Sequence, residues 1–256
     1  MKNTILIAIV ALSQFGCNTK TAETNASLGG GIKSVSTERM SGHDSKNSPA
    51  EANNAVAPET KPQEPGMDLA KIPAALKSDA YDYYGLGRTD PVKMTVTKNG
   101  SSEPATETVR LTKVDAGVAE FTISNDGGLV KLGKVLVSLD KNGIKVVSVD
   151  GQKADSETYE LPNGLTKGKS WPSKLQNGNL QLTCTNVVSG TESVTTSVGT
   201  YKDALLVIST ASGEQDGQKV QVKSKQWLVK GRGQVKADIT YVSGKTTQSV
   251  SMEESK

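Results

Sequence analysis

The clearest pattern in the chain is an alternation of apolar and polar residues at a period of two, which begins near residue 92. In the run 92–97, two valines and a methionine alternate with one lysine and two threonines. Successive side chains of a β-strand point to opposite faces, so this alternation is typical of strands with one buried face. The alternation returns in three later runs: Ala119–Ile123, Val135–Leu139 and Val235–Tyr241. Residues 204–208 are apolar without alternation, which predicts a strand covered on both faces.

Glycine-containing turn signals separate these runs at intervals of roughly 8–15 residues. Asn-Gly and Asp-Gly favour hairpins because both central residues of a type I′ turn need positive φ. The signals are Asn99-Gly100, Asn125–Gly128, Asn142-Gly143, Asp150-Gly151, Asn177-Gly178, Asp216-Gly217 and Ser243-Gly244. No helical pattern longer than about two turns lies between them. The sequence therefore predicts an all-β antiparallel meander of about nine to eleven strands, forming a curved sheet, a partly closed barrel or a sandwich.

This β domain is expected to span residues 67–256. Met67–Leu76 is weakly amphipathic and predicts one or two helical turns, and three tyrosines within 81–84 open the ordered region. Cys184 shares the parity of Leu180 and Leu182, so we expect it to be a buried, unreactive core thiol rather than half of a disulfide.

The N-terminal residues 1–16 are typical of an export signal. Lys2 supplies a positive charge, and Ile5–Leu12 is an unbroken apolar run. Such a run fits the hydrophobic region of a signal peptide, roughly 7–15 residues long. It is shorter than the roughly 20 residues that a membrane-spanning helix needs.

The segment Gln14–Cys17 resembles the lipobox of bacterial lipoproteins, with the small Gly16 directly before the cysteine that is acylated. Gln14 and Phe15 depart from the usual residues at their positions. Acylation of Cys17 by two or three chains would anchor the protein stably in a membrane. Ordinary signal cleavage, which would release a soluble periplasmic or secreted protein, is the alternative. By resemblance to Gram-negative lipoproteins, Asn18 favours the outer membrane, facing the periplasm or the cell surface.

Residues 17–66 have the composition of a flexible tether. From Asn18 to Gly66 there is no Phe, Trp or Tyr. Such a segment cannot bury enough apolar surface to offset the entropy of ordering, so we expect a disordered linker. The only histidine, His43, lies within it beside Asp44, where it is expected to be solvated rather than to bind a metal.

The C-terminal part of the chain resembles the TapB-like envelope proteins, relatives of domain of unknown function 3108. The resemblance rests on Leu161-Pro162 with Gly168–Trp171, on Glu192–Thr195 with Val198–Leu205, and on Trp227–Lys236, while Tyr81–Tyr84 matches an aromatic strand upstream. Lys230 and Arg232 depart from the family pattern at its glycine turn. The family implies a curved sheet similar to that of envelope lipoprotein carriers, with Trp171 and Trp227 as core anchors, and it implies no activity.

No constellation of catalytic residues is present in the sequence. The β domain contains no histidine, which removes Ser-His-Asp, Cys-His and ordinary zinc chemistry. The segment Gly164–Ser170 is one residue short of a phosphate-binding loop and precedes Trp171-Pro172, not a helix. Ser138–Lys141 matches S-x-x-K without its companion motifs. Acids that could in principle act as a pair are expected on solvated surface: Glu103, Glu107, Asp115 and Glu120. We predict no catalytic residue, no cofactor and no metal ligand.

The charge of the chain does not indicate nucleic-acid binding. Thirty Lys and Arg stand against 27 acidic residues, with no basic stripe and few aromatic residues for stacking on bases. Two functions remain. The first is a non-catalytic, membrane-anchored lipoprotein whose β domain binds another envelope component, protein or glycan. The alternative is a carrier or sensor of an apolar ligand in the concave face of a curved sheet.

Overall fold

The computed structural model describes residues 66–256, except 129–132, 155–157 and 178–179. Within this range nearly all regular structure is antiparallel β, which confirms the predicted fold class. The helical elements are η1 (Leu69–Lys71), η2 (Ala74–Leu76) and α2 (Asp79–Tyr84). The strands are β1 (Val92–Lys98), β2 (Ser101–Asp115), β3 (Val118–Gly127), β4 (Gly133–Asp140), β5 (Gly143–Val149), β6 (Gln152–Lys153), β7 (Leu161–Pro162), β8 (Ser170–Asn177), β9 (Leu180–Thr195), β10 (Thr200–Gln215), β11 (Gln218–Val229), β12 (Gly233–Ser243) and β13 (Thr246–Glu254).

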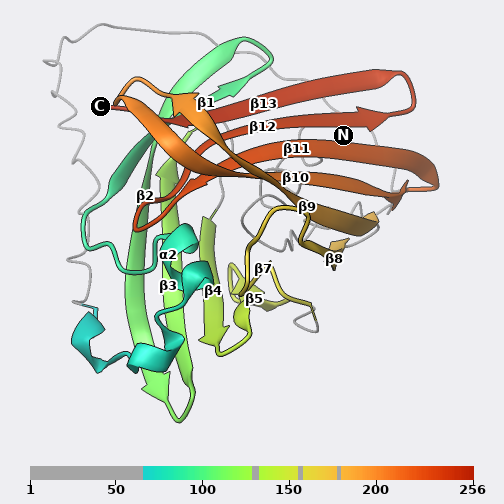
Figure 1. Cartoon of the computed structure of the whole chain (residues 1–256). Helices are drawn as coiled ribbons and strands as arrows, with labels where there is room; N and C mark the ends of the chain where they lie inside the picture. Colours follow the sequence, from blue (N-terminus) through green and yellow to red (C-terminus); the bar gives the residue numbers. More distant parts are fainter. Residues whose placement is uncertain (1–65, 129–132, 155–157, 178–179) are drawn as a thin grey trace, which may run out of the picture. The chain divides into compact units, whose positions relative to one another are not determined.

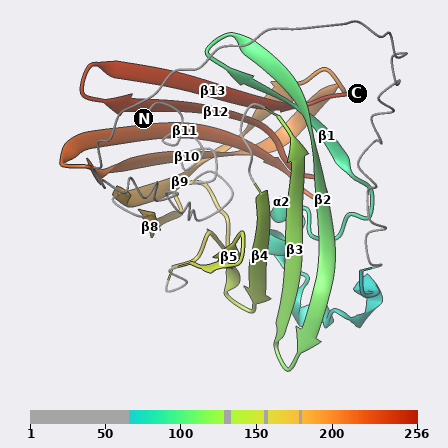
Figure 2. The same cartoon turned by 180° about the vertical axis from the view of Figure 1, so that it is seen from behind.

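The strands form one curved, unclosed sheet. Their order is β6-β5-β4-β3-β2-β1-β13-β12-β11-β10-β9-β8, and β7 pairs with β5 beside β6. The sheet thus consists of two meanders, an N-terminal half (β1–β7) and a C-terminal half (β8–β13), joined where β1 pairs with β13. Figure 1 shows β2–β4 running vertically and β10–β13 running horizontally, and the view from behind shows the same crossing (Figure 2).

The inner faces of the two halves bury the main core. It includes Phe121, Ile123 and Leu139 from the N-terminal half and Ile239 and Tyr241 from the C-terminal half. The short helix α2 contacts β5 and β7 on one side and β11 and β12 on the other. It therefore bridges the two halves where they approach each other.

Local sequence signals agree with much of this structure. In β1 the apolar residues at 92, 94 and 96 are buried. Both residues of Asn99-Gly100, Asp150-Gly151 and Asp216-Gly217 have positive φ, as type I′ turns require. The predicted helical turns within 67–76 are present as η1 and η2. The Asn177-Gly178 turn lies partly outside the described residues.

Three predictions are wrong. The described sheet has thirteen strands, not nine to eleven, because β6 and β7 are two-residue strands with no sequence period of their own. Tyr81–Tyr84 belongs to helix α2, not to an aromatic strand, and Gly85 ends that helix at φ 70°. Asn125–Gly127 continues strand β3 instead of forming a turn.

A second, smaller core lies on the outer face of the C-terminal half. Trp227 packs there with Val194, Ala204, Leu206 and Val235. Its indole N–H donates to the Glu192 carboxylate at 2.7 Å. This cluster explains why residues 204–207 are buried on both faces of β10, as their apolar run predicted. Trp227 is therefore an anchor of this second core, whereas Trp171 belongs to the main one.

Candidate functional site

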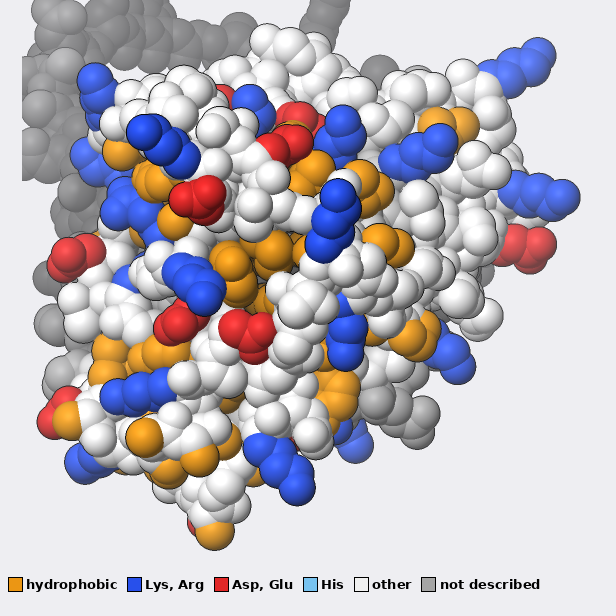
Figure 3. Space-filling model, in the orientation of Figure 1, with side chains coloured by type: hydrophobic (Ala, Val, Ile, Leu, Met, Phe, Trp, Pro, Cys, Tyr) orange, Lys and Arg blue, Asp and Glu red, His pale blue; other side chains and the backbone are white. Residues whose placement is uncertain are grey.

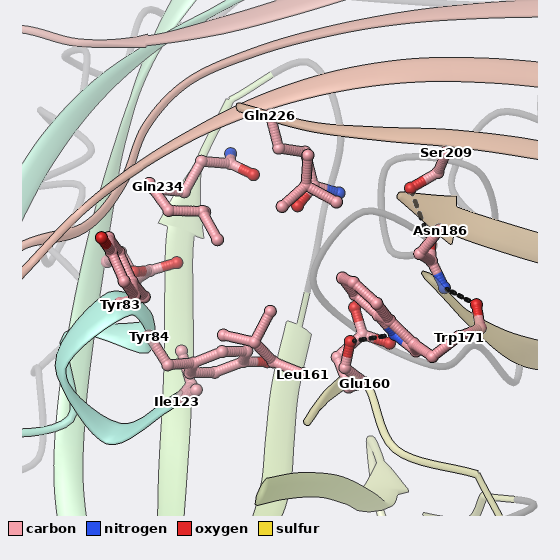
Figure 4. A pocket seen from close by; sticks show the side chains of 13 residues that line it. Tyr83, Tyr84, Ile123, Glu160, Leu161, Trp171, Asn186, Ser209, Gln226 and Gln234 are labelled. Atoms are coloured by element: carbon pink, nitrogen blue, oxygen red, sulfur yellow. Dashed lines mark hydrogen bonds between the residues drawn. The ribbon is translucent and has the colours of Figure 1, made fainter. Parts of the chain in front are cut away.

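A small pocket lies on the inner side of the sheet, where α2 and the segment before β7 meet both halves (Figure 4). Its interior is about 20 Å³, which is room for about one water-sized group. We refer to it as the polar pocket. It is lined by Tyr83, Tyr84, Glu107, Ile123, Glu160, Leu161, Trp171, Asn186, Val207, Ser209, Gln226, Leu228 and Gln234.

Helix α2 fixes one wall of the polar pocket. The Asp79 carboxylate accepts hydrogen bonds from the backbone N–H groups of Gly164 and Leu165, at 3.0 and 2.8 Å. Asn163 caps the helix from across the fold, since its Oδ1 accepts from Ser78 Oγ at 2.6 Å and from the Ala80 N–H at 3.2 Å. These contacts hold the chain that follows β7 against the start of α2.

A chain of hydrogen bonds fixes the opposite wall (Figure 4). Ser209 Oγ donates to Asn186 Oδ1 at 2.6 Å, and the Asn186 amide donates to Ser173 Oγ at 3.1 Å. The Trp171 indole N–H donates to the backbone carbonyl of Glu160 at 3.2 Å. Strands β8, β9 and β10 are thereby tied to the segment that carries Glu160.

Gln234 is the most unusual residue of the polar pocket. It is only 4% exposed, yet neither its amide nitrogen nor its amide oxygen has a hydrogen-bond partner among the described residues. A buried amide without partners costs about 1–3 kcal/mol, so such groups are rare and call for an explanation. Gln226 lies nearby in the same wall and is also buried.

Glu160 places a carboxyl group in the same pocket. Burial raises the pKa of this carboxyl to about 8. Within the described part of the chain, no lysine or arginine forms an ion pair with it. At neutral pH the group is therefore mainly protonated, and a positive charge nearby would favour its ionised form.

Glu107 is the second acid of the pocket, and its position corrects the prediction of a solvated surface residue. Its carboxylate pairs with Arg88, and the two side chains are 12% and 7% exposed. Arg88 also donates through Nη1 to the backbone carbonyl of Arg232 at 2.6 Å. The positive charge of Arg88 is thus already used by Glu107 and does not serve Glu160.

The chemical groups that line the polar pocket are mainly hydrogen-bonding ones. The pocket presents amide, hydroxyl and carboxyl groups, and no serine or cysteine lies beside a histidine, since the β domain has none. No group of three or more His, Cys, Asp or Glu that could hold a metal ion occurs among the residues placed by the structure. No described helix is long and apolar enough to cross a membrane.

The residues singled out from the sequence mostly lie elsewhere. Cys17 and His43 are outside the described residues. Cys184 is buried as predicted, and burial raises the pKa of its thiol to about 11. The segment Gly164–Ser170 runs into strand β8, so it forms no phosphate-binding helix start. Ser138–Lys141 lies at the end of β4, where a strand meets a turn.

Sequence reasoning missed Glu160, Gln226 and Gln234. For Gln226 a signal existed, because it shares the parity of the inward-facing Val222 and Leu228 on β11. Gln234 has no such signal, since a register shift between Trp227 and Leu228 disturbs the pairing with β12. Glu160 lies outside any strand and follows no pattern.

Comparisons with known proteins give a partial structural likeness. No protein-family model matches the sequence, and no curated protein matches it, so the resemblance to TapB-like proteins stays a prediction. A candidate exported protein with a YmcC-like fold from Bacteroides fragilis aligns over 68% of this chain and 97% of its own, at 10% identity and a TM-score of 0.43. A candidate lipoprotein from Parabacteroides distasonis aligns over 68% and 96%, at 11% identity and a TM-score of 0.44. Likeness at this level assigns no function to the chain.

Proposed function

We propose that the chain is an exported lipoprotein, anchored through Cys17 and carried on a tether of residues 17–66. Its β domain, residues 67–256, binds a small polar group of another envelope component in the polar pocket, without catalysis. The observation that carries the binding proposal is Gln234, a buried side chain whose amide atoms lack partners in a pocket built of hydrogen-bonding groups.

The pocket has the rigidity that selective recognition needs. Its polar side chains come from α2, from the segment before β7 and from five strands of the sheet. Asp79, Asn163 and Asn186 hold these elements together through hydrogen bonds that do not involve a ligand. Groups fixed in advance lose little entropy on binding, so a few hydrogen bonds give useful affinity.

The alternative, a carrier of an apolar ligand, has less support in the described domain. The apolar residues of the inner face are buried against one another. The polar pocket encloses only about 20 Å³, whereas sites for drug-sized apolar ligands enclose roughly 300–1,000 Å³. Figure 3 shows hydrophobic side chains in the middle of one face, among scattered Lys, Arg, Asp and Glu.

The anchor is tested with Cys17→Ser in cells of an expressing bacterium. The wild-type chain is expected to incorporate labelled palmitate and to sediment with membranes. Cys17→Ser is expected to lose the label and to shift to the soluble envelope fraction. A wild-type chain that takes up no palmitate would show ordinary signal cleavage instead.

Binding is tested in the full chain with a photo-crosslinking phenylalanine analogue at Tyr83, at the polar pocket. The matched control carries it at Thr210, an exposed residue of β10. We expect the analogue at position 83 to form a covalent adduct with the bound envelope component, and the analogue at position 210 to form none. Gln234→Leu is expected to abolish the adduct at position 83. Equal adducts at both positions, or an adduct that survives Gln234→Leu, would contradict binding in the pocket.

A further inference from the structure

The polar pocket holds one acid more than the Arg88–Glu107 ion pair neutralises. Two carboxyl groups line it, Glu107 and Glu160, and Arg88 pairs with Glu107. No other described cation forms an ion pair with either acid. If both acids are ionised, the site carries one uncompensated negative charge, which a ligand cation can neutralise.

The size and the polar groups of the pocket narrow the kind of cation. About 20 Å³ holds a single water-sized group, which matches the head of a primary ammonium and excludes a trimethylated one. A primary ammonium brings three N–H donors and no acceptor. The pocket offers acceptors to such donors in the Glu160 carboxylate and in the unpartnered Gln234 Oε1.

We propose that the polar pocket binds a primary ammonium group, with Glu160 as its counterion and Gln234 as a hydrogen-bond acceptor. This inference rests on the proposed binding function and names the chemistry of the ligand. The ammonium head enters the pocket, and the rest of the molecule that carries it stays outside.

Protonation of Glu160 gives the binding a measurable signature. Burial raises the pKa of this carboxyl to about 8, so near neutral pH it is mostly protonated in the free protein. Binding of R–NH₃⁺ turns Glu160–COOH into a carboxylate and releases its proton to solvent. The ammonium keeps its own three protons. The affinity is therefore expected to rise roughly tenfold for each pH unit as the pH approaches 8 from below.

Other ionisable groups near Glu160 could contribute to the pH dependence of the affinity. Tyr84 on α2, Glu107 on β2 and Cys184 on β9 interact with it or face the same pocket, and Arg88 offsets Glu107. Burial raises the pKa of the Cys184 thiol to about 11, and it raises the pKa of Tyr84 above its ordinary value. Neither group titrates between pH 6 and 8, so Glu160 dominates the change.

The test uses isothermal titration of the full chain with methylammonium, in buffers of different ionisation enthalpy. We expect binding at pH 7 with release of most of one proton, and about tenfold weaker binding at pH 6. Glu160→Gln, checked for folding by circular dichroism, is expected to lose the proton release and at least tenfold in affinity. Glu103→Gln removes an exposed acid of β2 and is expected to bind as wild type.

Two further probes identify the source of the ammonium. Phosphoethanolamine represents a phospholipid headgroup, and Nα-acetyl-lysine amide represents an amine side chain of a peptide; the tighter ligand indicates the source. Acetamide, which is neutral, is expected not to bind. Methylammonium binding that is unchanged in Glu160→Gln, or that releases no proton, would overturn the proposal. If methylammonium fails while the crosslink at Tyr83 still depends on Gln234, the pocket binds a neutral polar group and only this inference is wrong.

Discussion

Val96 in β1 lies directly opposite Met252 in β13, and this pair joins the two halves of the sheet. Both side chains are almost completely buried, at 0% and 2% exposure. Because β13 pairs with β1 on one side and β12 on the other, neither half can complete its core without the other.

Met252→Ala is expected to destabilise the whole β domain. Truncation of a buried methionine removes apolar contacts and leaves a cavity, which costs about 2–5 kcal/mol. The measurement is urea unfolding, with amide hydrogen exchange to follow β3 and β11 separately. The same change at Met67, which is 37% exposed, serves as the control and should cost less than about 0.5 kcal/mol. Strand β3 that stays protected while β11 exchanges freely would show that the halves are independent.

Glu160 is expected to make stability fall as the pH rises. An unfolded glutamate titrates near pH 4.3, whereas burial raises the pKa of folded Glu160 to about 8. Between these values the folded state binds more protons, so the free energy of unfolding decreases with increasing pH. Glu160→Gln should match the wild type near pH 4 and exceed it by about 5 kcal/mol near pH 9, because a pKa difference of one corresponds to about 1.4 kcal/mol.

This comparison is made by urea unfolding of wild type, Glu160→Gln and the exposed-site variant Glu103→Gln across the pH range. Only the difference between variant and wild type is interpreted, since other acids titrate too. A constant difference for Glu160→Gln at all pH values would mean that Glu160 ionises normally in the folded domain.

Gly213→Ala is expected to disrupt the pairing of β9 and β10. A Cβ at this position would lie 1.8 Å from the backbone oxygen of Gln181, and no flexible side chain could move away. We expect a loss of about 2–3 kcal/mol or more, seen as a lower urea midpoint. Gly199→Ala, in the hairpin between the same strands, meets no heavy atom within 4 Å and should change stability by less than about 0.5 kcal/mol. Equal effects of the two substitutions would contradict the register.

Cys184 is expected to resist thiol reagents while the domain is folded. Burial raises the pKa of its thiol to about 11, so the reactive thiolate is scarce at pH 8. Maleimide should label it only after urea unfolding, in a chain that carries Cys17→Ser. A Thr210→Cys thiol on the exposed surface of β10, introduced together with Cys184→Ser, should react within minutes. Rapid labelling of Cys184 in native buffer would show that strand β9 opens easily.

The sequence predicts those parts of the fold that depend on neighbouring residues. Strand parity identifies the buried residues of β1, and the Asp216-Gly217 pair identifies a hairpin, because period and turn geometry are local properties. Glu107 could also have been recognised as inward-facing, since it shares the parity of Ala105 and Leu111. The prediction of a solvated residue rested instead on its acidic side chain.

Long-range features could not be predicted in the same way. No residue near Val96 in the sequence indicates that β13 is its neighbour. That pairing depends on the burial of apolar residues from both halves of the sheet. The family resemblance implied an aromatic strand at 81–84, yet Gly85 and the contacts of Asp79 with a distant loop stabilise a helix. The polar pocket combines Tyr84, Glu160 and Gln234, which are adjacent only after folding.

The central position of β13 also has a kinetic consequence. A chain that is delivered N-terminus first, whether by a ribosome or a translocon, presents β1 long before its partner β13. Until then one edge of β1 has unpaired backbone groups that can capture other strands. The emergence of β13 is therefore the event that permits the two halves of the sheet to join.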